Sequence, residues 1–300
     1  MLAVVIPTLG RPNVILSMIK RLQEQSRKPD HVVISVVSKT DIPPDFDVSA
    51  AGCSVTLLTG PAGSSRQRNL AVNWLFAEAR FGTSSDVAVF FDDDFVPRAD
   101  WLAEAEVAFE ADAQLVGLTG IVLADGAGLV GYTESEANSI IAAGQPVLPA
   151  RDWRLQPGAT KGLYGCNMAV RGNFLASVRF DEALPLYAWL EDYDFSTELR
   201  RYGVLSRSSS LLGVHLGTKE SRGSGRRLGY SQIANAVYLS RKGTLSRKQA
   251  AILIVKNILA NLAKSPRPEP FIDRRGRALG NINAGLDLLR GRLHPSRIVR

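Results

Sequence analysis

The chain has 300 residues, of which 45% are hydrophobic and 22% are charged, and this length suffices for one large domain or for one domain with an appendage. Cys53 and Cys166 form no disulfide framework and lie in no metal-binding spacing, which favours a reducing compartment. No apolar run is long enough for a signal peptide or a membrane span, so the expected location is cytoplasmic, with the protein soluble or peripheral on a membrane.

The charge is unevenly distributed along the chain. Residues 217–300 hold 18 Lys/Arg against 4 Asp/Glu, a net charge of +14, whereas residues 1–216 carry a net charge of −7. A basic C-terminal region on a mildly acidic body predicts contact with an anionic partner such as phospholipid headgroups. A solvated basic surface without any partner is the alternative. Nucleic acid is not expected, because the region lacks interleaved aromatic residues suited to base stacking.

The first part of the chain alternates between apolar runs and helical patterns. Strands are predicted at residues 2–6, 31–37, 55–58, 87–91 and 115–123, and helices at about 14–25, 66–80 and 101–112. Such alternation predicts a parallel sheet with helices on both faces. Ligands bind such sheets in the crevice at the carboxyl ends of the strands.

The second part of the chain is less regular, and residues 124–160 show no clear pattern. A strand at 165–170, a short helix at 173–178, a helix at 189–202 and a last strand at 211–216 are predicted. The glycine-rich and cationic segment 217–229 is expected to be mobile. Helices at 229–243 and 245–263, a linker at 267–277 and a helix at 281–290 complete the chain.

The helix at 245–263 carries an apolar stripe with lysines beside it. Its members are Ile252, Val255, Leu259 and Leu262. This pattern allows an interfacial helix on an anionic membrane. It equally allows an ordinary helix that packs on the catalytic domain.

Three consecutive carboxylates, Asp92, Asp93 and Asp94, follow the most apolar predicted strand, 87–91. Negative side chains this close repel each other, so a divalent cation, arginines or both are expected beside them. Asp92 and Asp94 point to the same side of an extended chain and can share one ion. Oxygen ligands at a strand end suit Mg2+ or Mn2+. An acidic turn in which Asp94 caps local amides is the alternative.

The helix at 189–202 contains Glu191, Asp192 and Asp194. At 3.6 residues per turn, Asp192 falls on the apolar stripe of the helix, whereas Asp194 points elsewhere and is expected to be solvated. An ionised carboxylate on a core-facing stripe needs a function or a partner. Asp192 is therefore a candidate general base, with Glu191 as the nearest alternative. In the alternative explanation, Asp192 has only a structural role and its carboxylate binds Arg200 or backbone amides at the start of the helix.

Three further cationic side chains fall at predicted strand ends or helix starts. Arg66 and Arg68 stand at a helix start beside a Gly-Pro-Ala-Gly turn, where phosphate oxygens are favoured. His215 ends a predicted strand and could add an imidazole ligand to the metal. Arginines that flank a helix cap, and a structural histidine, are the simpler explanations.

Together these segments resemble family 2 glycosyltransferases, which are inverting enzymes that use nucleotide sugars and have the GT-A fold. The resemblance spans about residues 1–220. It rests on an ordered set of motifs: Val4-Val5-Ile6-Pro7-Thr8 with Arg11, Gly63 followed by Arg68-Asn69, Phe90-Phe91-Asp92-Asp93-Asp94, Gly165-Cys166-Asn167, Phe180-Asp181-Glu182, and Glu191-Asp192-Tyr193-Asp194-Phe195.

The resemblance implies an α/β fold with a mixed, mostly parallel sheet and a role for each matched residue. Asp192, with Glu191 beside it, would be the base that deprotonates the acceptor hydroxyl. Mn2+ or Mg2+ would bind Asp94, Asp92 and His215. The nucleotide sugar would contact Pro7, Thr8, Arg11, Arg66, Arg68, Asp92 and Asp93. Trp189 and Asn167 would lie on the acceptor side. Because water would hydrolyse the donor, segment 217–229, with Arg222, Arg226 and Arg227, is predicted to close over the diphosphate as a lid.

The resemblance also implies a division of the chain. Residues 1–220 would form the catalytic domain, with nucleotide-sugar binding in about 1–123 and the acceptor part in about 160–220, and residues 221–300 a basic lid loop and helical extension. The acceptor would be a glycan or a lipid-linked saccharide. One departure concerns the base: relatives carry an acidic pair after the second strand, where this chain has Val36-Val37-Ser38, so the nucleobase stays open.

Two other functions remain open. A sugar nucleotidyltransferase would need a glycine-rich phosphate loop directly after the first strand, which residues 7–12 do not supply. A non-catalytic subunit that binds nucleotide sugar or polysaccharide would not need both the Asp-x-Asp and the Glu-Asp motifs.

Overall fold

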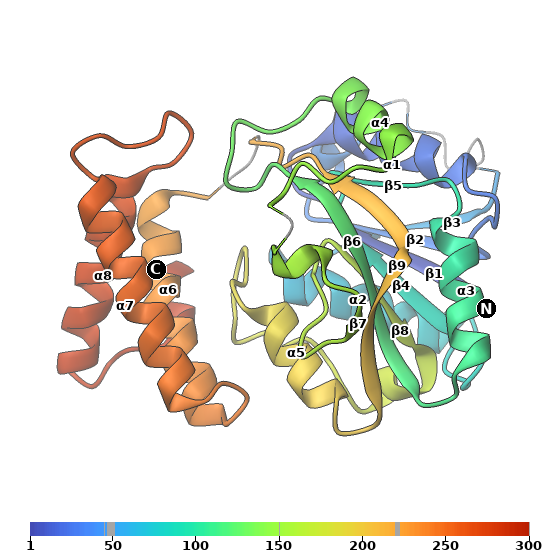
Figure 1. Ribbon diagram of the computed structural model, residues 1–300. Coiled ribbons are helices and arrows are strands. Elements are labelled where there is room, and N and C mark those ends of the chain that lie inside the picture. The colour runs from blue at the N-terminus through green and yellow to red at the C-terminus, as the bar shows by residue number, and fades with distance from the viewer. Residues whose placement is uncertain (45, 47–51, 150, 220–222, 300) are drawn as a thin grey trace. The chain divides into compact units, whose positions relative to one another are not determined.

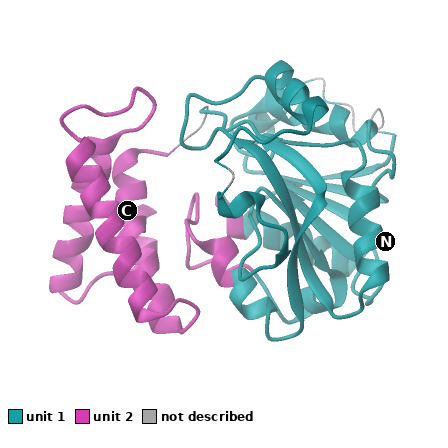
Figure 2. Ribbon diagram, viewed as in Figure 1, with its two compact units in different colours: residues 1–62, 66–179, 195–221 teal, residues 63–65, 180–194, 222–300 magenta. Residues whose placement is uncertain are grey.

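The computed structural model describes residues 1–300 except 45, 47–51, 150, 220–222 and 300. The chain forms two compact units, shown in Figure 2. The sheet unit comprises residues 1–62, 66–179 and 195–221, and the helical unit comprises 63–65, 180–194 and 222–300. The division of function between residues 1–220 and 221–300 stays a prediction.

Among the described residues, the sheet unit is built on one nine-stranded sheet (Figure 1). The strand order is β3-β2-β1-β4-β8-β6-β9-β5, with β7 paired to β9. The pairs β3-β2, β2-β1, β1-β4 and β6-β9 are parallel, while β8, β5 and β7 pair antiparallel. The predicted mixed α/β sheet is confirmed. The strands are β1 (Leu2–Pro7), β2 (His31–Val36), β3 (Ser54–Thr59), β4 (Val87–Phe91), β5 (Phe95–Pro97), β6 (Leu115–Asp125), β7 (Gly158–Ala159), β8 (Asn167–Arg171) and β9 (Val204–His215).

Helices cover both faces of this sheet. The helices α1 (Pro12–Gln23) and α3 (Trp101–Ala111) bury their apolar sides in one core with alternate residues of β1 and β4, such as Val4 and Val89. On the other face lies α2 (Ser64–Glu78), where the Ser35 hydroxyl of β2 donates to the Gln67 carbonyl oxygen. The helix α5 (Glu191–Leu199) contacts this face through the ring of Phe195, which packs edge-on against Phe90 of β4. Strands buried on both faces read as continuous apolar runs, which is why β1, β2 and β4 were predictable.

Three sequence-based assignments between residues 124 and 215 need correction. The strand β9 begins at Val204 rather than at 211, and α5 begins at Glu191 rather than at 189. Residues 124–160, which show no clear pattern, contain α4 (Glu134–Ala143). This helix begins with a capping box in which Thr133 and Glu136 satisfy each other's backbone N–H groups. The Thr-x-x-Glu spacing is the signal that would have predicted it.

The helical unit contains α6 (Gly225–Lys242), α7 (Arg247–Lys264) and α8 (Arg274–Leu289), each in contact with the other two. Glycines allow α6 and α8 to approach closely: a Cβ at Gly229 would lie 2.0 Å from the carbonyl oxygen of Arg277, and one at Gly280 would lie 2.1 Å from that of Arg226. The expectation of a mobile loop up to residue 229 is therefore wrong from residue 225 onwards. The expected linker at 267–277 likewise ends where α8 begins.

Asp194 is fully buried, so the expectation that it is solvated is wrong. It accepts hydrogen bonds from Lys242 Nζ at 2.7 Å and from Thr244 Oγ1 at 2.6 Å. Lys242 also donates to Asp181, at 2.7 Å. Burial lowers the pKa of Lys242, but its bonds to the two carboxylates outweigh this and leave the pKa above its ordinary value. Asp194 therefore anchors the chain after α6 instead of facing water.

Candidate active site

The three aspartates after β4 differ in exposure and in their partners. The side chain of Asp92 is 33% exposed, whereas Asp93 and Asp94 are 5% and 4% exposed as residues. The strand β4 is buried along its whole length, so the three carboxylates directly after it lie where the chain leaves the core at the end of the strand. Only Asp92 among them has substantial contact with solvent.

Asp93 holds the turn that follows β1. Its two carboxylate oxygens accept hydrogen bonds from Thr8 Oγ1 at 2.7 Å and from Arg11 Nη1 at 2.8 Å. Burial raises the pKa of Asp93 to about 7, against the opposing charge of Arg11. Both oxygens are thus engaged within the protein. These contacts indicate that Asp93 positions Thr8 and Arg11. Direct contact of Asp93 with a nucleotide sugar stays a prediction.

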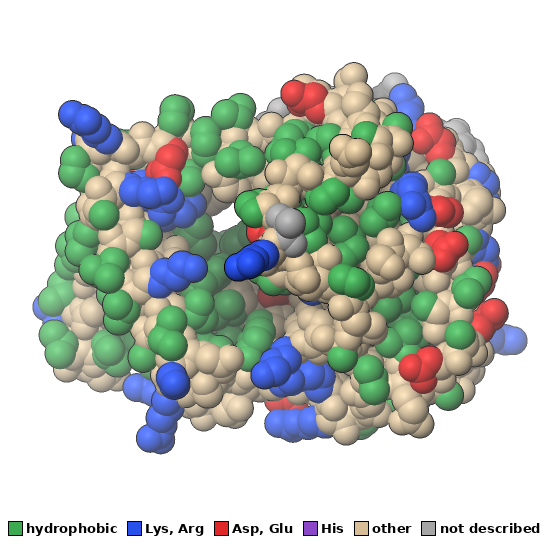
Figure 3. All heavy atoms as spheres, viewed as in Figure 1, with side chains coloured by type: hydrophobic (Ala, Val, Ile, Leu, Met, Phe, Trp, Pro, Cys, Tyr) green, Lys and Arg blue, Asp and Glu red, His purple; other side chains and the backbone are tan. Residues whose placement is uncertain are grey.

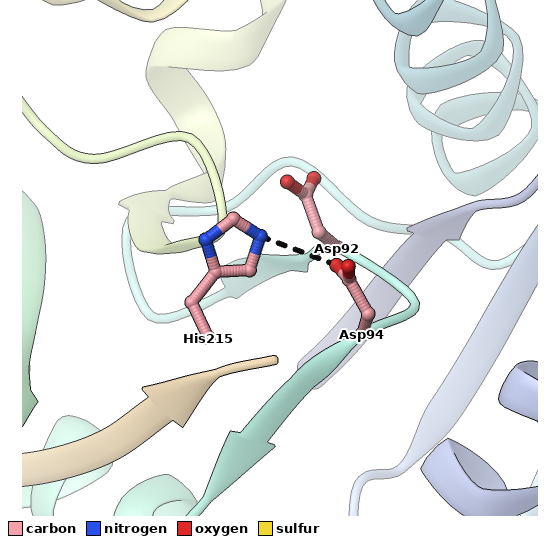
Figure 4. A group of neighbouring side chains, drawn as sticks. All are labelled: Asp92, Asp94 and His215. Carbon is pink, nitrogen blue, oxygen red and sulfur yellow. Dashed lines mark ion pairs between the residues drawn. The ribbon is translucent and has the colours of Figure 1, made fainter. Parts of the chain in front are cut away.

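Asp92, Asp94 and His215 converge at one point, as Figure 4 shows. Each offers a ligand atom, and these atoms all lie within 4.8 Å of one another. Strand pairing explains why: β5 runs antiparallel to β9 with Phe95 opposite His215. The residue before Phe95 therefore meets the imidazole, and Asp94 Oδ1 lies 3.3 Å from His215 Nε2.

The charges of this cluster balance in the absence of a cation. Burial alone would lower the pKa of His215, but the adjacent carboxylates of Asp94 and Asp125 raise it well above its ordinary value. Burial would likewise raise the pKa of Asp94, yet the imidazolium and Arg11 hold it below its usual range. Two carboxylates and an imidazole also form a donor set that fits a divalent cation, with the cation replacing the proton on His215. The described residues thus fit the predicted metal.

Asp125 is a functional candidate that the sequence interpretation missed. Its Oδ1 lies 2.9 Å from His215 Nδ1, because β6 and β9 pair in parallel with Asp125 opposite His215. Tyr164 donates its hydroxyl to Asp125 at 2.6 Å, and Arg154 donates to the same carboxylate. A carboxylate on the second nitrogen of a metal-binding histidine fixes the tautomer and orientation of the ring. Since Asp125 follows the predicted strand 115–123, the strand-end argument used for Asp92 would have identified it.

Replacing Asp125 with Asn is expected to weaken Mn2+ binding by about 10- to 100-fold, because His215 loses the acceptor that orients it. Isothermal titration of the purified protein with Mn2+ measures this directly. Asp152→Asn is the matched control, since Asp152 also accepts from Arg154 and the structure records no contact with His215 for it. Equal Mn2+ affinity in wild-type and Asp125→Asn protein would contradict the positioning role.

The predicted phosphate-binding residues occupy different environments. Arg68 is 1% exposed and donates from Nη2 to Asp92 Oδ1 at 2.7 Å and to the Gly165 carbonyl oxygen at 3.0 Å. Arg66 is exposed, and Pro7 is half-buried at the end of β1. Gln67, which sequence reasoning missed, donates to the carbonyl oxygens of Thr8 and Ser35 and so fixes the Thr8 turn. Contact of these arginines with a diphosphate stays a prediction.

Glu191 and Asp192 belong to the helical unit, and their side chains differ. The carboxylate of Glu191 accepts hydrogen bonds from Ser64 Oγ at 3.1 Å and from Ser65 Oγ at 3.2 Å, and the residue is 7% exposed. Asp192 is half-buried. Glu191 therefore ties the start of α2 to the start of α5. The catalytic role of Asp192 or Glu191, and the position of Asp192 opposite the metal cluster, stay predictions.

The backbone that leads into Glu191 is strained. Leu186, Ala188 and Leu190 have φ angles of 59°, 49° and 73°. This left-handed region is uncommon for residues other than glycine, and such strain persists where surrounding contacts maintain it. Two hydrogen bonds do so: Ser64 N donates to the Leu186 carbonyl oxygen at 2.9 Å, and Asn235 Nδ2 donates to the Trp189 carbonyl oxygen at 2.9 Å. The segment thus presents α5 in a defined orientation.

The remaining predicted residues are divided between the two units. Asn167 begins β8 and is fully buried, and its side-chain oxygen accepts from Thr119 Oγ1 at 2.8 Å. Trp189 is half-buried beside the strained segment. Arg226 and Arg227 are exposed on the first turn of α6 rather than on a loop, and Arg222 lies outside the described residues. Acceptor and lid roles for these residues stay predictions.

The sequence matches no protein-family model and no curated protein. One solved structure with a similar fold is S. aureus TarS, at 16% identity and a TM-score of 0.54, where the match covers 99% of this chain and 50% of TarS. Another is the mannosyltransferase PcManGT from Pyrobaculum calidifontis in complex with GDP-Man and Mn2+, at 16% identity and a TM-score of 0.52, where the match covers 99% of this chain and 84% of PcManGT. GalNAc-T7 with UDP, GalNAc and Mn2+ is also similar (13% identity, TM-score 0.54, 98% and 59%). The chain thus spans half the length of TarS. At these identities the likeness establishes the GT-A fold predicted from the sequence.

Proposed function

We propose that this protein is an inverting glycosyltransferase of family 2 type that moves a sugar from a nucleoside-diphosphate sugar to an acceptor hydroxyl. The observation that carries the proposal is the cluster of Asp92, Asp94 and His215 at strand ends of a GT-A fold. Two solved structures of similar fold contain a nucleotide or nucleotide sugar together with Mn2+. A glycan or a lipid-linked saccharide is the proposed acceptor, in the synthesis of cell-surface polysaccharide or glycoconjugate.

The donor would lie along the carboxyl ends of β1 and β4. Thr8 and Arg11, which Asp93 holds in place, would contact the diphosphate. Arg68, which donates a hydrogen bond to Asp92, would add positive charge beside the diphosphate. A divalent cation, Mn2+ or Mg2+, bound to Asp92, Asp94 and His215 would neutralise charge on the leaving diphosphate. Fixed positive charges at this position stabilise the transition state more than the ground state, because the negative charge on the diphosphate grows as the anomeric bond breaks.

The acceptor hydroxyl would be activated by Asp192. Removal of its proton as the sugar develops oxocarbenium character favours attack on the face opposite the diphosphate, which inverts the anomeric configuration. Glu191, the alternative base, binds Ser64 and Ser65 through its carboxylate. If the acceptor is lipid-linked, the enzyme would work at the inner face of the cell membrane.

A panel of nucleotide sugars tests the proposal. In the presence of Mn2+, one donor at about 100-fold above its dissociation constant is expected to raise the melting temperature by roughly 5 °C or more. Slow release of nucleoside diphosphate from that donor would indicate glycosyl transfer to water. Nucleotide-sugar formation from a sugar phosphate and a nucleoside triphosphate would instead identify a nucleotidyltransferase. Binding without turnover of any acceptor or water would identify a non-catalytic binding subunit.

A further inference from the structure

Two helices of the helical unit expose apolar stripes of the same spacing. On α7 the stripe consists of Ile252, Val255, Leu259 and Leu262, which are 53–60% exposed, and on α8 it consists of Leu279, Ile282, Leu286 and Leu289, which are 42–86% exposed. In both helices the spacing is i, i+3, i+7 and i+10, so each stripe follows one side of its helix. Within the helical unit, the α7 stripe is therefore not the side that packs against α6 and α8, and the alternative that it packs on the catalytic domain is not tested.

Each helix uses a different side for packing. The buried residues of α7 are Ala250 and Asn261, and those of α8 are Gly280, Asn281 and Ala284. Residues on these positions lie roughly opposite the stripes at 3.6 residues per turn. The two helices are thus apolar on an outer side that the bundle does not use. Scattered single hydrophobic residues need no explanation, but two stripes of the same spacing on helices in contact do.

The charge around these stripes is strongly positive. Residues 222–300 contain 17 Lys/Arg and 3 Asp/Glu, a net charge of +14. The acidic residues are already engaged: Glu269 pairs with Lys264 and Arg274, Asp287 pairs with Arg297, and Asp273 caps α8. On α7, Lys248 and Lys256 are exposed alongside the stripe. Figure 3 shows hydrophobic and basic side chains interspersed over the helical unit.

We infer that the outer sides of α7 and α8 bind the surface of an anionic phospholipid bilayer. The apolar stripes would enter the boundary between headgroups and acyl chains, and the lysines and arginines would contact headgroup phosphates. No helix in the described part of the chain is long and apolar enough to cross a bilayer, so the attachment would lie in the interface. A second copy of the chain fits less well, because two such faces would repel each other and the stripes contain no aromatic anchor.

Sedimentation of the full-length protein with vesicles tests this inference. Binding to vesicles of phosphatidylcholine mixed with phosphatidylglycerol is expected to be at least about tenfold tighter than binding to phosphatidylcholine alone, and to weaken with added salt. The combined variant Val255→Gln, Leu259→Gln, Ile282→Gln, Leu289→Gln is expected to bind at least about 100-fold more weakly. Since all four side chains are exposed, the fold should tolerate these changes, which a thermal melt checks.

The matched control changes two equally exposed valines of the sheet unit, Val107→Gln and Val130→Gln, and should bind vesicles like the wild type. Equal binding of the four-site variant and the wild type would overturn the inference. Dimerisation in light scattering that the four-site variant abolishes, with no vesicle binding by the wild type, would also overturn it and assign the stripes to self-association. Protection by nucleotide sugar plus Mn2+ should be the same in all variants, so failure of lipid binding remains distinct from failure of the proposed transferase activity.

Discussion

Replacing Asp192 with Asn is expected to lower the rate of sugar transfer by about 10²- to 10⁴-fold, the usual contribution of a general base. The amide keeps the shape of the side chain but cannot take up the acceptor proton. Binding of the nucleotide sugar should be nearly unchanged, because the proposed donor contacts lie in residues 7–11 and 92–94. The measurement compares kcat of the variant with its donor affinity from the thermal shift.

Glu198→Gln serves as the matched control for this variant. Glu198 lies on the same helix, α5, and pairs with Arg201 at 2.8 Å, so its loss should leave kcat within a factor of about two of the wild type, as for a surface pair worth less than 1 kcal/mol. Glu191→Gln should instead lower the melting temperature, because Glu191 anchors Ser64 and Ser65. Equal loss of donor affinity and kcat in Asp192→Asn would show that Asp192 is structural.

Replacing Asp94 with Asn is expected to abolish stabilisation by nucleotide sugar plus Mn2+ and to lower transfer by roughly 10³-fold or more. Asp94 is the buried carboxylate of the cluster, and it lies between His215 and the backbone N–H of Thr218, which donates to it at 2.7 Å. An amide at this position removes a negative charge that a divalent cation requires. Thermal melts across a Mn2+ titration, with and without donor, give the first readout, and transfer assays give the second.

The control for the metal centre is Asp100→Asn. Asp100 is a partly exposed aspartate of the sheet unit that pairs with Arg98 at 2.5 Å, and the variant should respond to Mn2+ like the wild type. His215→Gln should behave like Asp94→Asn if the imidazole is a ligand. Unaltered Mn2+ dependence in both Asp94→Asn and His215→Gln would rule out the proposed cluster as the metal site.

The sequence alone was sufficient to predict the fold class, and it singled out Asp92, Asp94 and His215, which the structure brings together. Strands such as β1 and β4 are buried on both faces and therefore appear as continuous apolar runs. Carboxylates placed directly after such a run, as at Asp92 and Asp94, are a local signal, and so is the spacing that puts both on one side of the chain. These features depend only on neighbours in sequence. They carry the metal prediction without any knowledge of tertiary contacts.

The helical unit shows where local reasoning reached its limit. The stripe on α7 was recognised from its spacing, but spacing identifies one side of a helix and not what covers it. Its exposure depends on which side α7 turns toward α6 and α8. The corresponding stripe on α8 escaped notice because the helix was expected to begin at 281 instead of Arg274.

Only the tertiary structure determined which partners each charged group has. The three aspartates after β4 are adjacent in sequence, yet Asp93 is occupied by Thr8 and Arg11 while Asp92 and Asp94 meet His215. Asp125 contacts His215 because β6 pairs with β9. Glu191, unlike its neighbour Asp192, accepts hydrogen bonds from Ser64 and Ser65. These pairings join residues 82 to 127 positions apart. Strand register and helix packing determine them, and neither leaves a signal in the neighbouring residues.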